Sequence, residues 1–160
     1  WAFPGGVDGR GGIALAAEQD PDAIVDVATL TGAAMVALGT RTAAVFANDD
    51  ELQGELTSAA TAVGENVWPM PIAEEIRPAM DSLVADLSHT GADMGGAMTA
   101  AAFLRNFAGT DDQDRPIPWG HLDIAGPAYN ESAPHGYTGK GGTGFATRTL
   151  VEFARVRCDG

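Results

Sequence analysis

Residues 23–32 read AIVDVATLTG, and this segment decides the class of fold. Its first six residues form a short β-branched and apolar run, the strongest strand pattern in the chain. Small apolar residues at 33–38 then predict a helix that Gly39 ends. A second strand is expected at 42–47, and a helix capped from its amino end is expected at 51–63. The order strand, helix, strand, helix predicts a layered α/β architecture.

The rest of the chain contains further strand and helix patterns, and no shift in composition marks a domain boundary. Further strands are expected at 83–87 and 119–125, and further helices at 13–19, 72–80, 98–107 and 147–156. An acidic surface loop is expected at 109–115. Residues 127–144 are rich in glycine and poor in apolar side chains, which predicts one long irregular loop. Such loops in compact domains often carry function.

Composition excludes several classes of function. The chain has 160 residues with 9 basic and 22 acidic side chains, so its formal net charge is −13. This charge would repel a phosphate backbone, and we expect no nucleic-acid partner. No apolar run approaches the roughly 20 residues that span a bilayer, and we expect no membrane contact. The first ten residues do not resemble a secretory signal and Cys158 stands alone, both of which suit a cytoplasmic protein.

Residues 7–12 place Asp8 and Arg10 in a glycine-rich segment that we expect to be a loop. One interpretation is functional: Asp8 binds a cation, and Arg10 holds an anion or a developing negative charge. The other is a solvated ion pair at a frayed terminus, worth under about 1 kcal/mol. The spacing of the two residues leaves both interpretations open.

The histidines and serines carry no recognisable motif. His89, His121 and His135 stand apart, without the spacing typical of zinc sites, and no serine lies in a G-x-S-x-G elbow. His121 lies in a predicted strand, which favours a buried structural histidine with satisfied hydrogen bonds.

Asp26 and Asp123 are unusual because each lies in an otherwise apolar strand. A buried carboxylate costs several kcal/mol unless it is paired or bound. Either each accepts backbone N–H bonds from a neighbouring loop, or each contributes to a site. Residues 29–32 join a strand end to a helix start, where open α/β sheets place ligands and where free N–H groups favour an oxygen atom. The residues therefore predict a site where 29–32 and 126–128 meet, without naming a reaction.

Five segments together resemble the M17 leucyl (cytosol) aminopeptidase family. They occur in family order and cover about residues 13–156. The segments are DVATLTGA at 26–33 followed by ALG at 37–39, VWPMP at 67–71, ADL at 85–87, WGHLDIAG at 119–126, and GFATRTL at 144–150. The resemblance implies the C-terminal part of a peptidase domain with an α/β/α sheet. Residues 1–160 would then be a partial M17 catalytic domain, family-like over 12–157 and atypical over 1–11.

The resemblance also implies a function. The family removes N-terminal residues, leucine prominently, from peptides, with two divalent ions (zinc or manganese) that share a bridging hydroxide. A lysine polarises the scissile carbonyl, and an arginine holds a bicarbonate. The family assembles as hexamers and is cytoplasmic, so peptide substrates and a homo-hexamer are the expected partners.

Only part of this site is carried by the chain. Most family ligands and the catalytic lysine lie upstream, and the family's N-T-D-A-E-G-R loop corresponds to PGGVDGR at 4–10. Aligning the Gly-Arg pair puts Arg10 on the catalytic arginine and Asp8 on the glutamate metal ligand, with Gly6 in place of the aspartate ligand. Asp8 alone cannot hold two cations, so we expect this chain to retain neither the metal ions nor bicarbonate.

The substrate-contact positions are better preserved. The resemblance assigns Thr29, Leu30 and Gly32 to contacts with the substrate's N-terminal residue, and Ala125 and Ala128 to the lining of the same pocket. Some members have methionine where this chain has Ala128, which would widen the pocket. Three hypotheses follow: an aminopeptidase by family whose isolated chain is inactive, a catalytically dead fragment that binds peptide or co-assembles with intact subunits, or an unrelated small-ligand α/β module. The five segments argue against the third.

Overall fold

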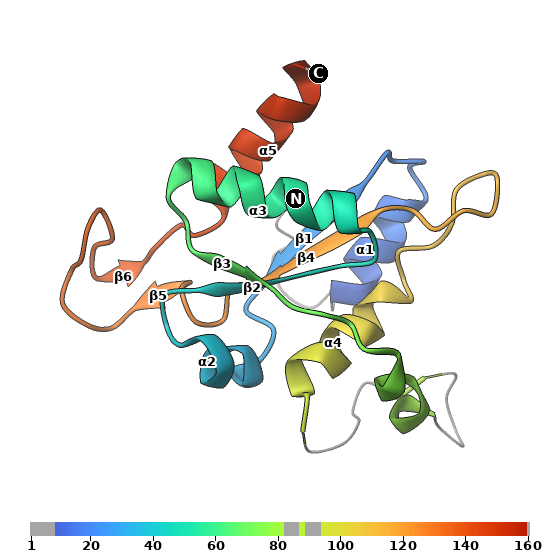
Figure 1. The fold of residues 1–160 in the computed structure, drawn as a ribbon, viewed down its shortest axis with the longest axis horizontal. Helices are drawn as coiled ribbons and strands as arrows, with labels where there is room; N and C mark the ends of the chain where they lie inside the picture. Colours follow the sequence, from blue (N-terminus) through green and yellow to red (C-terminus); the bar gives the residue numbers. More distant parts are fainter. Residues whose placement is uncertain (1–8, 82–86, 89–93, 160) are drawn as a thin grey trace.

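The computed structural model describes residues 9–81, 87–88 and 94–159 (Figure 1). Its main sheet has four strands in the order β1-β4-β2-β3. They are β1 (Ile24–Ala28), β4 (Trp119–Asp123), β2 (Ala43–Ala47) and β3 (Val67–Pro69). β1 is parallel to β4 and β2 is parallel to β3, whereas β2 and β4 are antiparallel. The carboxyl ends of β1 and β4 therefore lie at the same end of the sheet as the amino ends of β2 and β3.

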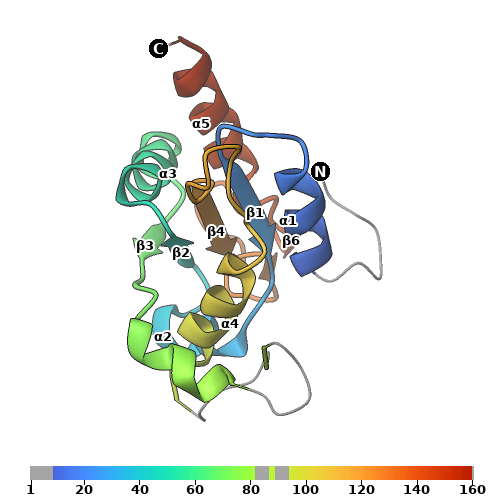
Figure 2. The same cartoon turned by 90° about the vertical axis from the view of Figure 1, so that its right-hand side faces the viewer.

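Helices cover both faces of this sheet. The helical segments are α1 (Gly9–Ala17), α2 (Gly32–Leu38), α3 (Asp50–Val63), the 3₁₀ helix η1 (Glu74–Met80), α4 (Gly96–Arg105) and α5 (Thr147–Asp159). Ile13 of α1 and Leu104 of α4 pack with Trp119 on one face of the sheet. On the other face, Leu52 of α3 packs with Leu122 of β4, and residues of α5 join the same cluster. Figure 2 shows the sheet between these layers, which confirms the α/β/α class.

β4 is the centre of the core. All five of its residues are buried, with Trp119 toward α1 and α4 and Leu122 toward α3. A Cβ atom at Gly120 would lie 2.6 Å from Cδ1 of Leu56. Because real Cβ atoms do not approach that closely, the glycine allows α3 to pack directly on this strand.

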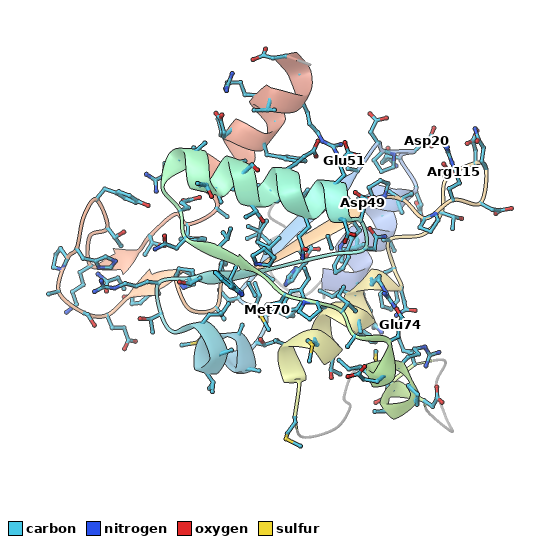
Figure 3. All side chains as sticks on the ribbon, viewed as in Figure 1. Asp20, Asp49, Glu51, Met70, Glu74 and Arg115 are labelled. Atoms are coloured by element: carbon cyan, nitrogen blue, oxygen red, sulfur yellow. The ribbon has the colours of Figure 1, made fainter. Side chains whose placement is uncertain are left out.

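The strands, caps and helices expected between 23 and 63 are confirmed. Asp49 caps α3, since its carboxylate accepts a hydrogen bond from the backbone N–H of Leu52 at 2.8 Å (Figure 3). Thr31 caps α2 in the same way through Ala34 N–H, and the helix ends at Gly39. The expected strand at 119–125 and the helices at 98–107 and 147–156 are also present, with boundaries shifted by a few residues.

Two expectations need correction, and one strand was not predicted. α1 begins at Gly9, so residues 9–12 are helical, because Ile13 is buried and Gly9 lies against Leu104. β3 is a strand that a Pro-rich segment did not suggest; Pro69 is tolerated because β3 is the edge strand of the sheet. The loop at 127–144 contains a small antiparallel pair, β5 (Tyr129–Asn130) and β6 (Gly141–Gly142).

Two smaller points complete the comparison. The helix expected at 72–80 is a 3₁₀ helix that contains Pro78. Most of the strand expected at 83–87 lies outside the described residues, as does His89. Among the described residues, no helix is both long and apolar enough to cross a bilayer.

Candidate functional site

Asp123 joins the turn before α2 to the residue that follows Ile124 after β4. This carboxylate ends β4 and is 1% exposed. Its Oδ1 accepts hydrogen bonds from the backbone N–H groups of Leu30 and Ala125, both at 3.1 Å. Its Oδ2 accepts a hydrogen bond of 2.7 Å from the Thr31 hydroxyl. The interpretation that Asp123 accepts backbone N–H bonds from a neighbouring loop is therefore confirmed, and this explains how a carboxylate is tolerated inside the core.

Thr31 connects Asp123 to α2. Its hydroxyl oxygen donates to Asp123 and accepts from Ala34 N–H at 3.0 Å, so one side chain connects β4 to the first turn of the helix. Gly32, the next residue, is exposed, and a Cβ atom there would meet nothing within 4 Å. Thr29 is exposed and Leu30 is 36% exposed. The three residues assigned to substrate contact thus stand on a fixed backbone and face open space.

Gly126 brings the segment after β4 against the end of α2. A Cβ atom at this position would lie 2.3 Å from the carbonyl oxygen of Gly39, a backbone atom that cannot move aside alone. Ala125 and Ala128 flank Gly126 and are half-buried, and Ala128 N–H donates to the Ile124 carbonyl at 3.0 Å. Asp123 connects residues 30 and 31 to Ala125, and Gly126 packs against Gly39. The meeting of 29–32 with 126–128 stays a prediction. The substrate roles of Thr29, Leu30, Gly32, Ala125 and Ala128 stay predictions.

Asp26 accepts hydrogen bonds from side chains, whereas the sequence suggested backbone N–H donors as one interpretation. Its carboxylate accepts from Trp119 Nε1 at 2.8 Å and pairs with His121 Nδ1 at 2.6 Å, so both partners are side chains of β4. Because a carboxylate only accepts, His121 carries a proton on Nδ1. His121 is fully buried as predicted, but its Nε2 has no hydrogen-bond partner among the residues the structure describes, so the expectation of full satisfaction is wrong. The sequence showed both residues as unusual, but their pairing depends on the β1–β4 register.

Arg10 and Asp8 are only partly placed. Arg10 lies in the first turn of α1 and is exposed. Asp8 lies outside the described residues, so its role as a metal ligand stays a prediction. Within residues 9–81, 87–88 and 94–159, no group of three or more His, Cys, Asp or Glu side chains could hold a metal ion. These residues therefore do not fit a two-metal centre, and we derive no catalytic step through metal ions.

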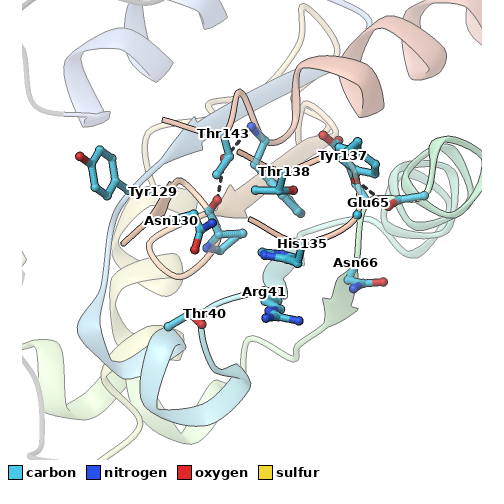
Figure 4. Close-up of a pocket in the computed structure, with 14 residues that line it drawn as sticks. Thr40, Arg41, Glu65, Asn66, Tyr129, Asn130, His135, Tyr137, Thr138 and Thr143 are labelled. Carbon is cyan, nitrogen blue, oxygen red and sulfur yellow. Dashed lines mark hydrogen bonds between the residues drawn. The ribbon is translucent and has the colours of Figure 1, made fainter. Parts of the chain in front are cut away.

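A cavity that the sequence did not reveal lies beside this region. It has a volume of about 200 Å³ and is lined from three places in the chain (Figure 4). These are Thr40 and Arg41 before β2, residues 64–66 after α3, and the loop that contains β5 and β6. Pro127 lines this cavity. It belongs to the segment 126–128 that the sequence predicts to contribute to the substrate site, so the cavity adjoins that segment. No sequence motif connects the three segments, so only the fold could show this cavity.

Comparison with known proteins agrees with the resemblance of the five segments. The catalytic domain of the cytosol aminopeptidase family (Peptidase M17) matches residues 11–151. A protein of Streptomyces avermitilis named "probable cytosol aminopeptidase" is 55% identical over 145 residues, which cover 91% of this chain and 27% of that protein. A protein of the same name from Leifsonia xyli is 53% identical over 148 residues, which cover 89% of this chain and 30% of that protein. This chain thus spans less than a third of the length of these relatives.

Solved structures give the same result. The bottromycin maturation enzyme BotP in complex with Mn is 40% identical, with a TM-score of 0.85, over 92% of this chain and 32% of that one. A mutant of tomato leucine aminopeptidase is 41% identical, with a TM-score of 0.80, over 91% of this chain and 26% of that one. The fold, the order of the matched segments and these similarities agree. The chain belongs to the cytosol aminopeptidase family and corresponds to part of its catalytic domain.

Proposed function

We propose that this chain is part of a metal-dependent aminopeptidase that releases N-terminal residues such as leucine from peptides. Its described residues would provide one wall of the substrate site, with Thr29, Leu30 and Gly32 facing Ala125 and Ala128. The observation that carries this proposal is the hydrogen bonding of Asp123, which anchors the backbone N–H groups of Leu30 and Ala125 and the hydroxyl of Thr31. A preorganised backbone at this position can hold the amino-terminal residue of a peptide without an ordering cost at binding.

The remaining catalytic groups are proposed to come mostly from outside this chain. The Mn-bound relative supports the use of a divalent metal, either manganese or zinc. Arg10, with or without bicarbonate, would assist proton transfer near Asp8. On this proposal the isolated chain is inactive and keeps no metal. The complete enzyme is proposed to act in the cytoplasm, in keeping with the names of the relatives. A homo-hexamer is proposed from the family resemblance alone.

Hydrolysis of a leucyl anilide tests this proposal. The purified 160-residue chain, with manganese or zinc added, is expected to show no turnover. When the catalytic-domain segment that precedes the matched region in the Streptomyces avermitilis relative is supplied in trans, we expect turnover that a chelator abolishes. An Arg10→Ala chain should fail to restore this activity, whereas the Arg77→Ala control, changed at an exposed residue of η1, should restore it. Turnover by the isolated chain that survives Arg10→Ala would contradict the proposed role of Arg10.

A second candidate is a catalytically dead fragment that binds peptide or joins intact subunits. The outer surface of α2 favours it, because Val36 is 90% exposed and Met35 is 39% exposed. Apolar side chains that protrude this far from a helix are typical of surfaces that another chain covers. Co-purification with an intact relative, without restored turnover in the trans experiment, would favour this candidate over the first.

A further inference from the structure

Arg41 and Lys140 differ from most other basic residues of this acidic chain. Arginines throughout the described residues are held by carboxylates within 4.0 Å, namely Arg77, Arg105, Arg115, Arg148, Arg155 and Arg157. For Arg41 and Lys140 the described part of the chain shows no such ion pair. Arg41 lines the 200 Å³ cavity, and Lys140 lies between Gly139 and β6 in the loop that forms its wall. Arg41 therefore brings a positive charge without an ion pair to this cavity, in a protein with a net charge of −13.

The wall of this cavity is held by hydrogen bonds of its own. The Tyr137 hydroxyl donates to the Gly64 carbonyl at 2.9 Å, which ties the loop to the turn after α3. The Thr143 hydroxyl donates to the Pro127 carbonyl at 2.6 Å, which ties the two ends of the loop together. His135 and Thr138 exchange two backbone hydrogen bonds of 3.0 and 2.8 Å. The positions of the lining residues are therefore set before any ligand arrives.

His135 supplies a polar atom without a partner. Its Nδ1 is buried and makes no hydrogen bond with the part of the chain that the structure describes. Figure 4 draws His135 and Arg41 among the residues that line the cavity, together with Thr40 and Asn66. Because Nδ1 of His135 is closed off from solvent, the guanidinium of Arg41 is the donor group on which the site depends.

Glu65 is the carboxylate that lines the same cavity, and its charge is already compensated. It is 4% exposed and accepts hydrogen bonds from the backbone N–H and the hydroxyl of Thr149. Arg148 lies 3.6 Å from its other oxygen and stacks over the Tyr137 ring at 3.7 Å from the centroid. The charge of Arg41 is therefore the one that a ligand would meet uncompensated.

We propose that this cavity binds a small oxyanion, held by the planar guanidinium of Arg41. A guanidinium offers two parallel N–H donors, which match the two oxygens of a carboxylate or of a phosphate. The volume is below the roughly 300–1,000 Å³ of drug-sized sites, so the site takes a single anionic group and not a peptide. None of the residues assigned to aminopeptidase catalysis takes part, and the proposal stands whether or not the chain contributes to a peptidase.

An NMR titration of the ¹⁵N-labelled 160-residue chain tests this. Sodium acetate and sodium phosphate are added in separate experiments, and sodium chloride serves as the control for ionic strength. We expect saturating shifts of the Gly136 and Thr138 amide signals with one of the two oxyanions, with a Kd on the order of 1 mM. The better ligand distinguishes a carboxylate site from a phosphate site.

Two variants decide whether Arg41 is responsible. Arg41→Gln should weaken binding at least about tenfold, whereas Arg77→Gln, which removes an exposed arginine of η1, should leave the Kd unchanged. Arg41→Lys keeps the positive charge without the two parallel donors and should weaken binding less than Arg41→Gln. It provides an independent result if Arg41→Gln does not fold. Shifts that do not saturate, that chloride reproduces, or that persist in both cavity variants would overturn the proposal.

Discussion

Asp26 and His121 occupy paired positions in the register of β1 and β4, and Oδ1 of the carboxylate lies 2.6 Å from Nδ1 of the imidazole. Trp119, two residues before His121 on the same strand, donates to the other carboxylate oxygen at 2.8 Å. Its indole ring lies at 11° to the imidazole plane, with 6.1 Å between the centroids. Asp26 is thus the shared acceptor of two aromatic donors, and it fixes the alignment of the two strands whose ends carry the candidate site.

Asp26→Asn tests this shared acceptor. Asparagine can accept from one of the two donors but not from both, so a buried donor loses its partner. We expect the free energy of unfolding to fall by about 1–3 kcal/mol in urea denaturation. Asp22→Asn, on the exposed turn before β1, is the control and should stay within about 0.5 kcal/mol of the parent. Equal stability of the two variants would show that the pair contributes nothing.

Thr31→Ala tests the connection between Asp123 and α2. The change removes both the cap of the helix and one hydrogen bond to a buried carboxylate, so we expect a loss of about 1–3 kcal/mol in stability. Thr61→Ala in α3 removes only an exposed hydroxyl that donates to Thr57 carbonyl, and should change stability by less than about 0.5 kcal/mol. Thermal and urea unfolding of both variants give the comparison.

Gly126→Ala tests the close approach of the segment after β4 to the end of α2. The new methyl group would overlap the Gly39 carbonyl, so one backbone segment must move, and we expect a loss of about 1–3 kcal/mol. Gly54→Ala is the matched control inside α3, where a Cβ meets nothing within 4 Å. This control should gain about 0.5–1 kcal/mol, because alanine is the better helix former. If both variants changed the free energy of unfolding in the same direction, the close approach of Gly126 to the Gly39 carbonyl would be contradicted.

Asp111 should titrate below its ordinary pKa of 3.8, and the cause should lie mostly in the backbone. The Arg115 backbone N–H donates to Oδ1 at 2.9 Å and is the largest cause that lowers the pKa of this carboxyl, ahead of the Arg115 side chain. A lowered folded-state pKa means that the stabilisation is present above the unfolded value and is lost as pH falls through the folded value. Arg115→Gln should therefore raise the pKa of Asp111 only in part. An NMR titration of the Asp111 carboxyl carbon measures this, and a complete return to the ordinary value would show that the side chain dominates.

Metal addition and removal should leave the isolated chain unchanged. Its described residues hold no cluster of three potential metal ligands, so this part of the chain offers manganese or zinc no preferred site in the folded state. We expect the Tm to stay within about 1 °C when 1 mM manganese is replaced by a chelator. A clear rise of Tm with manganese, abolished by Asp8→Asn, would show that residue 8 completes a metal site.

The strand and helix patterns of residues 23–63 were predictable because local chemistry and tertiary structure agree there. A β-branched run, a threonine cap and a glycine terminator favour the same elements that packing selects. The start of α1 was mispredicted, and β3 was not predicted, for the opposite reason. The glycines of 9–12 disfavour a helix locally, and burial of Ile13 outweighs that preference. Pro69 disfavours a strand locally, and pairing of β3 with β2 at the edge of the sheet outweighs it.

The sequence by itself determined the α/β class, the family, and the identity of Thr29–Gly32 and 125–128 as the segments of interest, because these depend on residues close together in the chain. Tertiary structure alone decided which partners Asp26 and Asp123 use, since hydrogen bonds spanning more than 90 residues follow from strand register. It also decided that Arg41, Glu65 and His135 line one cavity. Sequence patterns report short-range preferences, whereas a site built from distant segments exists only once the sheet has set their relative positions.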